Sequence, residues 1–141
     1  MGEIISATTR FMRVQGKEAE FLSKATVLLR QAKQHRREGD LLLALELGYQ
    51  SALRTAGAVI AGSPVAKRKR KPRGAWDQLR LVDAQAATWA DELSQFSQLR
   101  SRAASGLAVS LSQEKLDRFL LQVAHFLEEA EQSLGWSTEA A

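Results

Sequence analysis

The chain has 141 residues, which corresponds to about one domain, and its formal net charge is +4. It contains no cysteine, which excludes disulfides, zinc–thiolate sites and thiol chemistry. We find no run of about 18 apolar residues and no signal-peptide pattern at the N-terminus, so we expect no membrane-spanning segment. These absences favour a cytoplasmic protein without a metal or other cofactor.

Most of the positive charge lies in one short stretch of the sequence. Between positions 67 and 73 there are six basic residues and no acidic one: Lys67, Arg68, Lys69, Arg70, Lys71 and Arg73. Without them the chain has 14 basic and 16 acidic residues, so the remainder is slightly acidic. The stretch predicts a site for RNA, DNA or another polyanion, because bound phosphates would release their counterions there. Two alternatives remain, a solvated loop that only keeps the protein soluble and, in a eukaryote, a nuclear import signal.

The N-terminal half of the chain predicts a helical hairpin. Residues 1–16 show no clear period and are expected to form a tail. Apolar spacing of three and four residues then predicts a helix from about 17 to 38, ended by Gly39, and a second helix over 41–60, capped by Asp40. Because only two residues connect them, the helices should lie antiparallel. The apolar stripe of the second helix consists of Leu42, Leu45, Tyr49, Ala52, Leu53, Ala56 and Ile60, and small residues such as Gly48 should let another helix pack closely.

The C-terminal half follows the basic loop, which we place at residues 63–74. Helical spacing continues over 75–104, and a single helix there would be about 45 Å long. The other predicted helices are roughly 30–35 Å long at the same rise per residue, so we expect a break near Asp83 to Gln85. Ser110 and Gln113 form a possible capping box for a last helix that Gly135 ends. We expect Trp136 to fold back on the bundle and residues 137–141 to form a tail.

No segment alternates apolar and polar residues with a period of two. The sequence therefore predicts an all-α protein, a four- to five-helix antiparallel bundle that forms one domain over residues 17–136.

Two residues of the last predicted helix have side chains suited to phosphodiester chemistry. Arg118 and His125 are seven residues apart, about 20° short of two turns, so they share a helix face opposite the apolar stripe. An imidazole can move a proton near neutral pH, while a guanidinium stabilises the charge on a phosphorane. The same pattern also occurs on ordinary surface helices, and Arg30 with His35 satisfies a similar spacing. The two histidines show no metal-ligand spacing.

Several features occur in a recognisable order along roughly residues 20–134. They are Ser51-Ala52-Leu53-Arg54-Thr55-Ala56, the basic loop, Ala75-Trp76-Asp77-Gln78-Leu79, Trp89-Ala90 with Phe96, Arg100 or Arg102, Leu107-Ala108-Val109-Ser110 and Phe126-Leu127. This order resembles a small bacterial family within the HEPN superfamily. The tryptophan pair and the basic loop are the more specific parts of the resemblance, whereas the rest is common to many helical proteins.

The resemblance implies a HEPN-type helical bundle that is commonly a homodimer. Many HEPN proteins are metal-independent endoribonucleases whose motif is an arginine, four to six residues and a histidine near the dimer interface, and other branches are binding modules. Arg118 and His125 match this motif, although Phe119 stands where the family usually has a polar residue. The leading hypothesis is a dimeric domain that binds RNA through the basic loop. The alternatives are a ribonuclease that uses Arg118 and His125, and an interaction module for an acidic protein.

Overall fold

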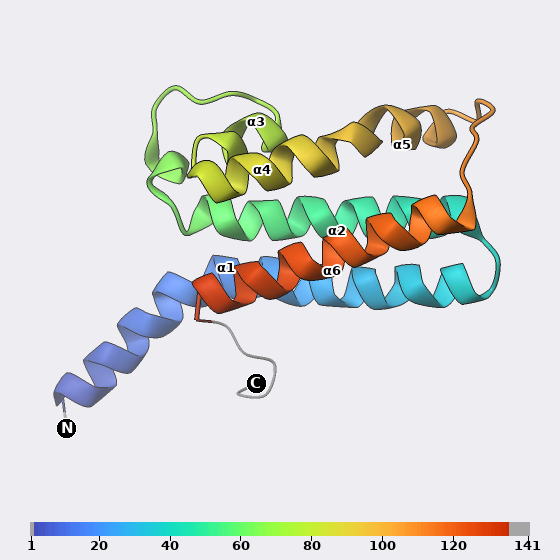
Figure 1. Cartoon of the computed structure of the whole chain (residues 1–141). Coiled ribbons are helices and arrows are strands. Elements are labelled where there is room, and N and C mark those ends of the chain that lie inside the picture. Colours follow the sequence, from blue (N-terminus) through green and yellow to red (C-terminus); the bar gives the residue numbers. More distant parts are fainter. Residues whose placement is uncertain (1, 136–141) are drawn as a thin grey trace.

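The computed structural model describes the backbone of residues 2–135 and the side chains of residues 16–135. Trp136 and the predicted tail 137–141 lie outside the described residues. The elements are α1 (Gly2–Arg37), α2 (Leu41–Ala61), the 3-10 helix η1 (Pro64–Lys67), α3 (Ala75–Arg80), α4 (Ala84–Leu93), the 3-10 helix η2 (Ser94–Phe96), α5 (Ser97–Ala104) and α6 (Gln113–Ser133). Figure 1 shows the α1–α2 hairpin with α6 along it and the short helices α3 to α5 beside α2. The all-α prediction is confirmed.

The α1–α2 hairpin forms as its turn residues predict. Gly39 has a φ of 84°, a conformation that favours glycine, and the Asp40 carboxylate accepts a hydrogen bond of 3.2 Å from the Leu43 amide. The helix α1, however, begins at Gly2, so it continues through the residues for which we expected a tail. Residues 2–15 contain no proline, and helical hydrogen bonds form without an apolar period. In Figure 1 the first turns of α1 extend beyond the rest of the bundle.

The segment after the basic loop is broken where helix length predicted a break. Helix α3 ends at Arg80, and the Asp83 carboxylate caps α4 by accepting a 2.7 Å hydrogen bond from the Ala86 amide. The predicted cap of α6 at Ser110 is wrong, because Ser112 is the N-cap and accepts from the Lys115 amide. Residues 107–112 form no regular secondary structure, and Leu111 within this segment packs against the core.

The core surrounds α2, and its largest fully buried side chains include Leu22, Leu45, Leu79, Leu93, Leu116, Phe119 and Val123. At Gly48 a Cβ atom would lie 2.6 Å from the Leu120 Cδ2 atom, so α6 approaches α2 as closely as the small residues predicted. The stripe predicted for α2 is wrong at Leu42, which is 44% exposed. Leu42 lies in the first turn of α2, where the small residues Ala103 and Ala104 at the end of α5 line a pocket beside it.

Candidate nucleic-acid interface

The basic loop is held to the bundle at both of its ends. The first residues of the loop predicted over 63–74 form the short helix η1, so we restrict the basic loop to residues 67–73. In η1, Val65 is only 2% exposed, and the Ser63 side chain caps the helix. After the loop, Trp76 is 9% exposed and donates a 2.9 Å hydrogen bond from Nε1 to the Tyr49 hydroxyl of α2. The loop therefore leaves the bundle and returns to it at two fixed points that both contact buried groups.

Between these points, all six basic side chains are exposed: Lys67, Arg68, Lys69, Arg70, Lys71 and Arg73. None of them forms an ion pair with another residue among positions 16–135, whose side chains the structure describes. Lys71 donates a 3.1 Å hydrogen bond to the Ala66 carbonyl, and Gln78 donates one of 2.6 Å to the Pro72 carbonyl. These bonds hold the loop backbone and leave its positive charges unneutralised.

An open pocket of about 260 Å³ lies between the loop and the hairpin. Lys71 and Arg73 of the loop line it together with Lys17 and Phe21 of α1 and Gly57 of α2. The sequence by itself does not connect Lys17 and Phe21 with the loop. Their spacing of four residues puts them on one face of α1, but no local pattern indicates that the loop folds back towards that face.

Arg118 and His125 lie on the exposed side of α6, as their spacing predicts. Neither side chain has a hydrogen bond or ion pair with any residue in the described part of the chain. Their backbone positions are about 10 Å apart along the helix axis. Leu121, which lies between them in the sequence, is 56% exposed, whereas Phe119 is fully buried in the core and contributes no polar group to this face.

The structure does not bring this pair together with the basic loop. Asp117, next to Arg118, accepts a 2.7 Å hydrogen bond from Arg36 near the α1–α2 turn, which raises the pKa of Arg36 and lowers the pKa of Asp117. The loop instead follows the C-terminal end of α2. Figure 1 shows these two places at opposite ends of the bundle, so the loop and Arg118 cannot contact one phosphate within one copy of the chain.

The alternative pair, Arg30 and His35, is separated on α1. Five residues along a helix turn through about 500°, so the two side chains point in directions about 140° apart. The His35 Nδ1 atom also lies 3.4 Å from the Glu38 carboxylate on its own helix. This pair is therefore a poorer candidate than Arg118 and His125 for joint action on one group.

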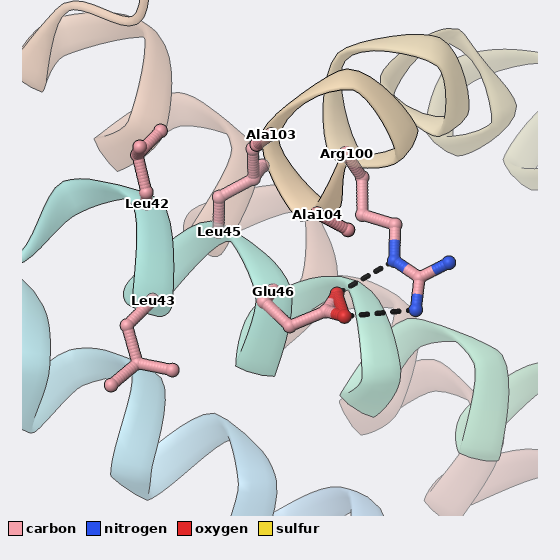
Figure 2. A pocket seen from close by; sticks show the side chains of 7 residues that line it. All are labelled: Leu42, Leu43, Leu45, Glu46, Arg100, Ala103 and Ala104. Carbon is pink, nitrogen blue, oxygen red and sulfur yellow. Dashed lines mark hydrogen bonds and ion pairs between the residues drawn. The ribbon is translucent and has the colours of Figure 1, made fainter. Parts of the chain in front are cut away.

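Arg100, by contrast with Arg118, is paired with another side chain inside the bundle. It donates two hydrogen bonds, of 2.6 and 2.8 Å, to the Glu46 carboxylate, and its guanidinium lies 5.4 Å from the centre of the Tyr49 ring. The hydrogen bonds to Glu46 raise the pKa of Arg100. Figure 2 shows this ion pair beside a pocket lined also by Leu42, Leu43, Leu45, Ala103 and Ala104. The pair joins α5 to α2 at the tyrosine that also accepts the Trp76 hydrogen bond.

Residues 16–135 contain no group of three or more His, Cys, Asp or Glu side chains placed to hold a metal ion. Among the described helices, none combines the length and the apolar character that crossing a membrane requires.

Comparison with known proteins gives one family for the chain. No curated protein matches it. The model of the family described as HEPN_SAV_6107-like HEPN matches residues 32–131, which is more than half of the chain and includes α2, the basic loop, α3 to α5 and most of α6. The helical bundle described above agrees with this match, because HEPN domains are helical. The chain therefore belongs to this family of HEPN domains.

Proposed function

We propose that this HEPN domain binds RNA through the basic loop, residues 67–73. The observation that supports the proposal is the exposure of all six cationic side chains on one loop, with no ion pair to the described residues. The rest of the chain is slightly acidic. A phosphate backbone would therefore be attracted to this loop rather than to the surface as a whole.

The anchored ends of the loop favour such binding. Val65 and Trp76 fix where the loop begins and ends, so an RNA would order only the segment between them. Ordering less backbone lowers the entropic cost of association. Arginine also matches phosphate oxygens with two parallel hydrogen bonds, and three of the six residues are arginines: Arg68, Arg70 and Arg73.

The test is fluorescence anisotropy of a labelled single-stranded RNA, titrated at several salt concentrations in EDTA. If all six cations contact phosphates, the logarithm of the association constant should fall with the logarithm of the salt concentration with a slope of roughly −4. The triple variant Arg68→Gln, Arg70→Gln and Arg73→Gln should flatten this slope by roughly 2. A control triple with the same loss of charge is Lys33→Gln, Arg37→Gln and Arg102→Gln, all exposed and outside the loop.

Two results would contradict the proposal. The control triple weakening RNA binding as much as the loop triple would mean that net charge alone attracts the RNA. The absence of RNA binding even at low salt would favour an acidic protein as the partner of the loop.

A second candidate function is metal-independent RNA cleavage by Arg118 and His125. It is favoured by their shared exposed face and by the exposed apolar Leu121 between them, which a second copy of α6 would cover in a homodimer. In this reaction the imidazole of His125 removes the proton of a ribose 2′-hydroxyl. The 2′-oxygen then bonds to phosphorus, the bond from phosphorus to the 5′-oxygen breaks, and the leaving oxygen takes up a proton from solvent, to which the His125 imidazolium returns its own proton. The guanidinium of Arg118 stabilises the charge that develops on the phosphate.

Cleavage is tested by following the same RNA on a denaturing gel for hours in EDTA. The cleavage hypothesis predicts loss of product in His125→Ala and in Arg118→Gln, and unchanged product in the control His35→Ala. Leu121→Glu should shift the protein from dimer to monomer in light scattering and remove the activity as well. If the RNA stays intact in the presence of the wild-type dimer, the cleavage hypothesis fails and RNA binding stands as the proposed function.

A further inference from the structure

Two open pockets lie one after the other along the α1–α2 hairpin, the first beside the basic loop, and we call them together the groove. On α1 its residues recur at three- and four-residue spacing, and on α2 they do the same: Lys17, Phe21, Lys24, Leu28 and Gln31 on α1, and Gln50, Arg54, Gly57 and Ala61 on α2. The pocket next to the loop includes Phe21 and Gly57, and a second pocket of about 410 Å³ includes Lys24 and Arg54. Because these residues are one turn apart on each helix, the two pockets follow one another.

The floor of the groove is apolar and includes an aromatic ring. Phe21 is half-buried and lies against α2 where glycine leaves room, since a Cβ atom on Gly57 would be 3.2 Å from the ring's Cε1 atom. Further along, Leu28 and Val27 line the second pocket, and Val27 is 46% exposed. The loop itself contains no aromatic residue, so Phe21 provides the surface on which a planar base would stack.

The rim of the groove is cationic. Lys17 and Arg54 are exposed and form no ion pair with another described side chain, and Lys24 pairs with Glu20 at 3.0 Å on the solvent side of α1. Lys71 and Arg73 close the end beside the loop. An apolar floor with cations on both sides fits a ligand that has flat apolar faces and a charged backbone.

We propose that this groove holds a single-stranded stretch of RNA, with its bases against Phe21, Val27 and Leu28 and its phosphates towards Lys17, Arg54 and the loop. The inference rests on the proposed RNA binding of the loop and names the form of RNA that the domain selects. A duplex keeps its base faces stacked inside, so it gains the phosphate contacts but not the contacts with the floor. From Lys17 to Leu28 the groove is about 16 Å long, which is room for a few nucleotides.

The experiment compares three labelled RNAs of equal length by anisotropy: an intact single strand, the same strand with abasic sugars and a duplex. The wild-type protein should bind the intact strand roughly fivefold or more tighter than the abasic strand, since stacking on an aromatic ring strengthens binding by about that factor per base. Phe21→Leu keeps an apolar side chain but removes the ring, so the intact strand should lose most of its advantage over the abasic strand in this variant. Binding of the abasic strand should not change.

Two controls separate the groove from general effects of substitution. Phe96→Leu removes another half-buried ring, which packs against Phe119 at 4.3 Å in the core and away from the groove, and it should lower stability without changing RNA selectivity. Arg54→Gln should weaken all strands that reach the groove, whereas Arg102→Gln, on α5, should weaken none. Circular dichroism of each variant checks that the bundle is folded.

The outcomes distinguish this inference from the proposal on which it rests. If wild-type protein binds intact, abasic and duplex RNA equally, and loop substitution removes all three, then the groove inference is overturned and RNA binding by the loop stands. A Phe21→Leu variant that keeps the preference for the intact strand would overturn the inference as well. If no RNA binds, both proposals fail.

Discussion

Three arginines of the bundle and the six cations of the basic loop differ in their partners. In the bundle, Arg36, Arg80 and Arg100 each donate hydrogen bonds to a carboxylate, and two of these pairs join residues far apart in the sequence, Arg36 with Asp117 and Arg100 with Glu46. The six loop cations have no such partner among the described residues. The same residue types therefore hold helices together in one region and remain available for an external anion in the other.

The largest expected effect comes from replacing all six loop cations with glutamine. RNA affinity at about 0.15 M salt should fall by roughly 100-fold or more, because most of the counterion release is lost. The midpoint of thermal unfolding should hardly change, since surface substitutions usually alter the unfolding free energy by less than about 0.5 kcal/mol. Anisotropy and calorimetry measure the two quantities. A large loss of stability would mean that the loop is part of the fold rather than an interface.

Arg100→Gln should have the opposite effects, a loss of stability and an unchanged RNA affinity. It removes both hydrogen bonds to Glu46 and the contact with the Tyr49 ring, leaving a partly buried carboxylate without its partner. We expect the unfolding free energy to fall by roughly 1–2 kcal/mol, after allowance for the solvent that reaches this pair. RNA affinity should stay the same. A double-mutant cycle with Glu46→Gln isolates the pair, and additive effects of the two substitutions would contradict the role given to it.

Tyr49→Phe tests the connection between the two regions. The substitution removes the hydroxyl that accepts from Trp76 Nε1 and leaves a buried donor unsatisfied, which costs about 1 kcal/mol or somewhat more. Because Trp76 anchors the C-terminal end of the loop, RNA affinity should also fall a few-fold. Tryptophan fluorescence in denaturant measures the first effect and anisotropy the second. If affinity is unchanged, the anchor does not shape the RNA site.

The smallest effects concern pH, and two carboxylates should behave oppositely. The hydrogen bond from Arg36 lowers the pKa of Asp117 below 3.8, so its contribution to stability is present above that value and is lost as the pH falls through the lower, folded-state pKa. Burial, and then the charge of Glu128, raises the pKa of Glu131 above 4.5, so stability falls as the pH rises through this range. Asp117→Asn should reduce acid sensitivity, and Glu131→Gln should stabilise the protein slightly at neutral pH. Unfolding curves measured between about pH 2 and pH 7 check both signs.

Local signals predicted the turns well and the packing less well. Gly39 and Asp40 determine the hairpin through backbone conformation and capping, and both effects depend only on neighbouring residues. The exposure of Leu42 and the full burial of Leu22, which the sequence analysis did not include in the core, depend instead on which helices arrive from elsewhere. A hydrophobic period gives the apolar face of a helix but not how far along that face a neighbour extends.

The candidate sites also contain features that local sequence indicates and features that depend on how the chain folds. The charge of the loop and the shared face of Arg118 and His125 follow from composition and helical spacing, so the sequence alone indicates them. The hydrogen bond between Tyr49 and Trp76 joins residues 27 positions apart, and the place of Phe21 beside the loop depends on how the chain folds back. Neither has a local pattern, which is why both emerge only from the structure.

The two anchors of the basic loop have a consequence for how this domain can vary. Because Val65 and Trp76 contact the bundle, and the residues between them contribute little to its core, insertions between the anchors should leave the helices unchanged. Doubling the length of a flexible loop costs only about 0.6 kcal/mol in closure entropy. The number and order of charges in this loop can thus change from one variant to another while the bundle is preserved. A designer could replace the segment with a different recognition sequence and use the domain as a scaffold.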